Sequence, residues 1–213
     1  PTPRMSEQNQ AQFDAMLTVL LSANDAERNS AEQALRTLDT PQNADQLAVF
    51  LINAIKNATL PKESRQMACS LLHRRVRRRD EESTDNDDNN GSTDGTTSTT
   101  TSSSNNNNNN NLYDLCSGGV KEFMKRELVS AYEQERDRAV QMKLAEVLAD
   151  LSGLLSAGQR GGWAELLPFV FRLTKSADAG QREGAMVLFS ELGVELGAEV
   201  FRPFFDVIEQ ILE

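Results

Sequence analysis

Three stretches of this chain repeat one pattern: an arginine, an alanine three residues later and a large apolar residue four residues after that. The copies are Arg28, Ala31 and Leu35; Arg65, Ala68 and Leu72; and Arg182, Ala185 and Phe189. The first two arginines are 37 residues apart. Self-similarity at such a period is typical of solenoids built from stacked helix pairs.

A fourth copy lies between the second and third. Val140 and Leu144 occupy its alanine and leucine places, and Asp137 stands where the arginine is expected. From Arg65 to Asp137 is 72 residues, of which 32 belong to segment 80–111, so that 40 remain. Another 45 residues lead to the third arginine. These intervals fit HEAT repeats, whose period is about 40–47 residues.

Apolar residues recur at helical spacing along the chain, and no alternation typical of strands is present. The pattern predicts nine helices, whose apolar stripes begin at Phe13, Ala31, Leu47, Ala68, Leu115, Val140, Trp163, Ala185 and Phe201. Asn24 or Asp25 is expected to cap the second helix, and Pro61 suits the first turn of the fourth. The predicted fold is therefore an all-α, right-handed α-solenoid of about four and a half HEAT repeats.

Segment 80–111 interrupts this pattern. It has seven acidic residues, no basic residue and no aliphatic or aromatic side chain. Such a segment cannot bury apolar surface, so we predict that it is disordered. The expected organisation is HEAT repeats 1 and 2 in residues 1–79, an acidic insertion in 80–111, and repeats 3, 4 and the first helix of repeat 5 in 112–213.

Charge and composition narrow the function classes. The net charge is −10, but outside segment 80–111 there are 25 acidic and 22 basic residues, and no basic face indicates nucleic-acid binding. No apolar run is long enough for a membrane span. Two cysteines and one histidine are too few for a zinc site or a disulfide framework. We expect no cofactor, no metal and no enzymatic activity.

The densest basic cluster runs from His73 to Arg79. Three interpretations stay open. The cations complement the dipole at a helix C-terminus, they contact an acidic partner, or they form a nuclear localisation signal. The chain ends at Glu213 directly after an apolar stripe, which favours an N-terminal fragment of a longer solenoid.

Specific motifs resemble the importin-beta (karyopherin-beta) superfamily of nuclear transport receptors, especially its importin-five and importin-four branch. The resemblance rests on "LLSANDAERNSAEQAL" (20–35), "RQMACSLLHRRV" (65–76), and Trp163 followed by "LPFVFRLTKSADAGQREGAMVLF". It covers nearly the whole chain except segment 80–111, which departs from the family.

The resemblance implies a function in nuclear import. Members bind the small GTPase Ran in its GTP form, bind Phe-Gly nucleoporins, carry protein cargo and shuttle between cytoplasm and nucleus. It also implies that the inner helices, here near 25–38, 62–79, 135–156 and 178–196, face Ran. The polar candidates for Ran contact are Asn29, Glu32, Arg65, Gln66, Arg74 and Arg75.

Two alternatives accompany this interpretation. Arg65 also fits a structural repeat arginine that bonds between loops. The whole chain also fits a cytosolic HEAT-repeat scaffold or adaptor for protein complexes, because the fold alone does not separate the two functions.

Overall fold

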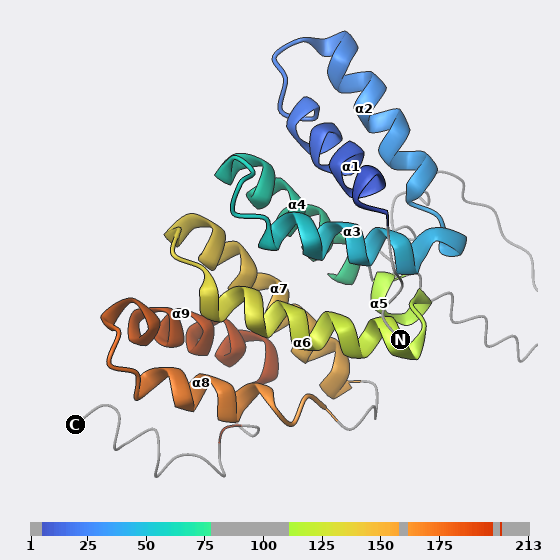
Figure 1. Ribbon diagram of the computed structural model, residues 1–213. Coiled ribbons are helices and arrows are strands. Elements are labelled where there is room, and N and C mark those ends of the chain that lie inside the picture. Colours follow the sequence, from blue (N-terminus) through green and yellow to red (C-terminus); the bar gives the residue numbers. More distant parts are fainter. Residues whose placement is uncertain (1–5, 78–110, 158–161, 198–200, 202–213) are drawn as a thin grey trace, which may run out of the picture.

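The computed structural model describes residues 6–77, 111–157, 162–197 and 201. Within these ranges the chain forms helices and no strand, which confirms the predicted all-α fold. Successive helix pairs stack side by side along the molecule (Figure 1). None of the helices in these ranges is long and apolar enough to cross a membrane.

Within the described ranges, four antiparallel pairs make up the stack. The first helices of the pairs are α1 (Glu7–Val19), α3 (Ala44–Lys56), α6 (Gly118–Gln134) and α8 (Leu166–Thr174). The second helices are α2 (Asp25–Leu38), α4 (Lys62–Arg77), α7 (Arg138–Ala157) and α9 (Ala179–Leu196). In the second layer α4 packs against α7 and α7 against α9. In the first layer α1 packs against α3 and α3 against α6 (Figure 1).

Side-chain caps set several helix starts. Ser6 accepts a hydrogen bond from the Asn9 amide, and Asp178 accepts one from the Gly180 amide. Of the two predicted caps for α2, Asn24 is the one observed, and its side chain accepts from the Ala26 amide. Pro61 precedes α4 by one residue, and its carbonyl accepts a hydrogen bond from the Arg65 amide. Proline has no backbone N–H, and none is needed at this position because the first amides of a helix have no partner within the helix.

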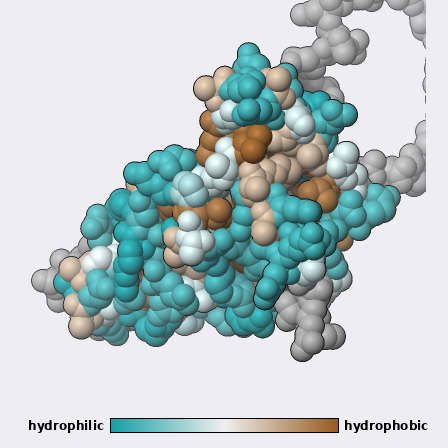
Figure 2. All heavy atoms as spheres, turned by 45° about the horizontal axis from the view of Figure 1, so that its top comes forward, coloured by the Kyte–Doolittle hydropathy of each residue, from teal (hydrophilic) through white to brown (hydrophobic). Residues whose placement is uncertain are grey.

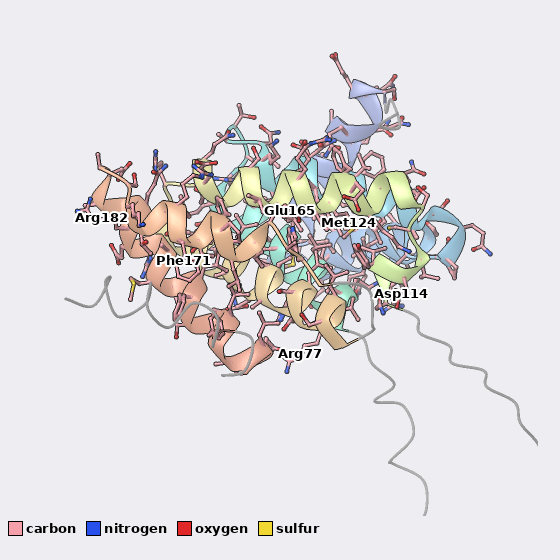
Figure 3. All side chains as sticks on the ribbon, turned by 90° about the horizontal axis from the view of Figure 1, so that it is seen from below. Arg77, Asp114, Met124, Glu165, Phe171 and Arg182 are labelled. Atoms are coloured by element: carbon pink, nitrogen blue, oxygen red, sulfur yellow. The ribbon has the colours of Figure 1, made fainter. Side chains whose placement is uncertain are left out.

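The apolar stripes form one continuous core, and Figure 3 shows side chains filling the space between the ribbons. The largest fully buried aliphatic side chains are Leu17, Leu51, Ile52, Ile55, Leu72, Leu112, Met124, Leu128, Leu144, Leu148 and Leu151. The apolar positions that follow Phe13 in the sequence extend the first predicted stripe to Leu21, and Leu21 is an exception to this core. The helix α1 ends at Val19, and Leu21 is 42% exposed in the turn that follows.

Two helix boundaries differ from those predicted from the sequence. Leu115, predicted to open the stripe of the fifth helix, lies instead on the single turn α5 (Leu112–Leu115), and the backbone is extended at Cys116 before α6 begins. Asn111 caps this turn by accepting the Asp114 amide, a local signal that the apolar periodicity cannot reveal. A short 3₁₀ turn, Pro41–Asn43, precedes α3. The predicted disorder of segment 80–111 and the predicted last helix from Phe201 fall outside the described residues, apart from Asn111 and Phe201 themselves.

Truncation of Leu148 tests the core. Leu148 on α7 is fully buried, so Leu148→Ala leaves a cavity and should lower the free energy of unfolding by about 2–5 kcal/mol. On the same helix Met142 is 49% exposed, and Met142→Ala should change it by less than about 0.5 kcal/mol. Urea denaturation of the two variants measures both values, and equal losses would contradict this core.

Candidate functional site

A surface opening lies between the second helices of the first two pairs. Unlike α4 and α7, which pack closely, α2 stands off from α4, and a cavity of about 550 Å³ separates them. We call it the α2–α4 groove. Its apolar floor is formed by Leu20, Leu35, Leu47, Leu51, Met67 and Leu71. Its charged lining is formed by Arg28, Glu32, Arg36, Asp39, Arg74 and Arg75.

The groove carries more positive than negative charge, because four arginines face two carboxylates. Arg75 is only 8% exposed, and its guanidinium lies 2.7 Å from Asp39 Oδ1. Arg36 lies 3.8 Å from Glu32, with 81% of its side chain exposed. Arg74 is exposed and has no ion-pair partner within the described ranges. Two guanidinium groups, Arg36 and Arg74, are therefore accessible to an approaching acidic group.

The structure brings three of the six predicted Ran candidates into this groove, namely Glu32, Arg74 and Arg75. Asn29 is exposed on α2 and Gln66 is half-buried on α4, and neither lines the groove. The sequence analysis missed Arg28, Arg36 and Asp39. The first two lie four residues before and after Glu32, so helical spacing alone could have placed them on the same face.

Arg65 lies away from the groove, between helix pairs. Its side chain is 13% exposed and forms an ion pair with Glu135, the residue after α6, whose side chain is 4% exposed. Its Nε also donates to the Ile55 carbonyl at 2.8 Å, near the end of α3. Arg65 is thus occupied inside the chain, a geometry that fits the structural role considered as its alternative.

The other arginines of the repeat pattern make the same kind of contact. Arg28 donates to the Ser22 carbonyl at 3.1 Å, and Arg182 donates to the Ser176 carbonyl at 2.8 Å. Each guanidinium therefore satisfies carbonyls in or before the turn that leads into its own helix. In the fourth copy Asp137 instead caps α7 by accepting the Ala139 and Val140 amides at 3.0 and 3.1 Å.

The remaining titratable candidates do not form a reaction centre in the described part of the chain. Burial raises the pKa of the Cys69 thiol to about 12, so the thiol stays protonated and poorly nucleophilic. The described ranges contain no group of three His, Cys, Asp or Glu side chains that could hold a metal ion.

These features define the class of protein as an α-solenoid with a charged groove on its second-helix layer. Comparison with known proteins is consistent with this class. Residues 136–213 match a family described as "IPO5-like, TPR repeats". Both TPR and HEAT repeats are stacked helix pairs, and the intervals of 40 and 45 residues here exceed the period of about 34 residues that is typical of TPR repeats.

Solved karyopherin structures share the fold. The chain superposes on Kap95p, from a study of its binding to RanGDP, with a TM-score of 0.65 and 16% identity over 88% of this chain. It superposes on Kap121p bound to Ste12p with a TM-score of 0.60 and 16% identity over 90%. For Kap121p bound to RanGTP the values are 0.56, 15% and 92%. The chain spans only 15–19% of the length of these proteins.

The family match over residues 136–213 and the shared karyopherin fold agree with the resemblance to the importin-beta superfamily that the motifs indicate.

Removal of the Arg65 guanidinium should strongly destabilise the stack. Arg65→Ala leaves the buried Glu135 carboxylate without its cation, which costs about 3–5 kcal/mol. The matched control is Arg182→Ala, because Arg182 holds the same place in the repeat but is exposed, so its loss should cost about 1 kcal/mol. Urea denaturation measures both, and a smaller effect at Arg65 than at Arg182 would refute the structural role.

Proposed function

We propose that this chain is part of a nuclear import receptor that binds the GTP form of Ran through the α2–α4 groove and carries protein cargo between cytoplasm and nucleus. The observation that carries the proposal is the groove itself, with accessible Arg36 and Arg74 above an apolar floor. The karyopherin fold supports it, because Kap121p with this fold was crystallised with RanGTP.

The chemistry of the groove suits a partner segment with an apolar side chain flanked by carboxylates. On the floor, Leu35 and Met67 are only half-buried, and they offer apolar surface that a partner side chain could cover. Arginine presents a planar fork that binds carboxylates in a bidentate fashion. Because Arg75 is already paired with Asp39, we assign direct partner contact to Arg74 and treat Arg75 as a residue that shapes the groove.

A HEAT-repeat scaffold for other protein complexes is the competing function, and it uses the same fold. The two differ in nucleotide dependence. An import receptor should bind Ran loaded with a non-hydrolysable GTP analogue much more tightly than Ran loaded with GDP, whereas a scaffold should show no such preference.

Charge reversal at Arg74 tests the site. Arg74→Glu places a carboxylate where an acidic partner group is expected, and it should weaken binding to GTP-loaded Ran by about tenfold or more. The control is Lys175→Glu, since Lys175 is exposed at the end of α8 and outside the groove. Calorimetry on the wild type and both variants measures the affinities. Equal affinities for all three proteins would show that Ran does not bind in the α2–α4 groove. Equal affinity of the wild type for the GTP and GDP forms of Ran would favour the scaffold function.

For Phe-Gly nucleoporins we propose a second surface, an apolar groove between α1 and α2. Its lining residues are Gln12, Ala15, Met16, Val19, Ala26, Glu27, Ser30, Ala31 and Ala34. Figure 2 shows brown and tan atoms gathered toward the end of the molecule where α1 and α2 lie, on a face that is otherwise mostly teal. Only Glu27 in this lining is charged, which suits an uncharged aromatic ligand.

A charge at Val19 should abolish this second interaction. Val19 lines the groove and is 37% exposed, so Val19→Glu should reduce binding of a Phe-Gly repeat peptide by more than about tenfold with little change in stability. Leu21 is similarly exposed but outside the lining, and Leu21→Glu is the control. If Leu21→Glu weakens binding as much as Val19→Glu, the peptide does not bind at this groove.

A further inference from the structure

One face of α4 meets α7 with a row of polar side chains. Arg65, Cys69 and His73 follow one another at intervals of four residues, which places them on the same face of the helix. At the far end of the row, His73 Nε2 lies 2.6 Å from Asp150 Oδ2, and His73 Nδ1 lies 4.0 Å from Glu146 Oε2. Both carboxylates belong to α7, so one imidazole faces two acidic groups across the boundary between helix pairs.

We propose that His73 is a proton-sensitive clasp between the α3–α4 pair and the α6–α7 pair, closed when its imidazole is protonated. The imidazolium carries a proton on both nitrogens and a full charge, so it attracts both carboxylates. The neutral ring has one proton to donate and no charge to hold Asp150 and Glu146 together. Opening the clasp therefore loosens the C-terminal half of α4 from α7.

The surroundings of the imidazole favour the protonated form. The contact with Asp150 raises the pKa of His73 above its usual value, burial opposes the rise, and Glu146 adds to it. Arg77 on the same helix lowers the pKa, and Lys143 lies 2.8 Å from Glu146 and competes for that carboxylate. Asp150 is the dominant partner, because its side chain is only 8% exposed and little water can solvate its negative charge.

The direction of the pH dependence follows from this shift. A pKa raised by folding means that the folded chain holds the His73 proton more tightly than the unfolded chain. The stabilisation is complete below the ordinary histidine pKa of about 6.5 and disappears as the pH rises through the folded-state pKa. The clasp therefore opens on the alkaline side of about pH 6.5, in the range in which cytoplasmic and nuclear proteins work.

Two further ion pairs described at this boundary contain no imidazole. Lys56 pairs with Glu127, and Arg65 pairs with Glu135. The chain has a single histidine, which makes this response traceable to one residue.

The first test needs no substitution. In a proton NMR titration of the 213-residue chain without a histidine tag, the only imidazole signal belongs to His73. We expect its midpoint above pH 6.5, and Asp150→Asn should move the midpoint back toward or below about 6.5. A wild-type midpoint at or below about 6.5 would overturn the proposal.

The second test measures the boundary itself. Between about pH 6 and about pH 8.5 the wild-type Tm should fall by about 2–4 °C more than the Tm of His73→Gln, which keeps a neutral donor but cannot be protonated. Lys56→Gln is the matched control, since it removes a pair from the same boundary but leaves His73 in place, and it should keep the wild-type slope. A His73→Gln variant with the full wild-type slope would show that the clasp does not exist.

Discussion

Burial of most of α3 is the constraint on which the described solenoid depends. Nine of its 13 residues are buried, and the polar Asp45, Gln46, Asn53 and Lys56 lie on one side of the helix, so neighbours must cover the rest of its circumference. Here α1, α4 and α6 cover it, so that α3 contacts all of the first three pairs. No single pair can bury α3, and stacking is therefore a condition of folding rather than a later association.

Ion pairs between the helix pairs fix how neighbouring pairs align, and the more deeply buried an ion pair is, the more its loss costs. Arg65 and Glu135 are both nearly enclosed, whereas Arg172 and Glu133, 2.6 Å apart at the next boundary, are 59% and 32% exposed. Exposed pairs contribute about 0–1 kcal/mol, and enclosed pairs are costly to break. The boundary between the second and third pairs is the one that the acidic segment interrupts in sequence, and it carries the most enclosed ion pair described here.

Much of this fold was predictable from local sequence, because apolar periodicity reports which face of a helix is covered. Leu72 and Leu144 are buried as their stripes predicted. The turn at Leu112–Leu115 was not predictable in this way, since four residues are too few to show a period and its start depends on the Asn111 cap. For the α2–α4 groove, the sequence could indicate some of the charged residues but not their arrangement in space. The charges of the groove lie on two helices whose separation follows from tertiary packing, and pairs such as Arg75 with Asp39 join residues that no local pattern relates.

The separation of α2 from α4 has a consequence for the energetics of recognition. The first pair is held to the rest mainly through α1, whose Phe13 ring stacks on Phe50 at 4.9 Å and whose Asp14 accepts a hydrogen bond from Asn57. On the groove side the ion pair between Asp39 and Arg75 joins the C-terminal end of α2 to α4, while the cavity separates the two helices along its lining residues. A ligand that changed this separation would lose part of its binding free energy in moving α2. A cross-link that fixed α2 at its bound distance from α4 would then raise affinity without adding a single contact to the ligand.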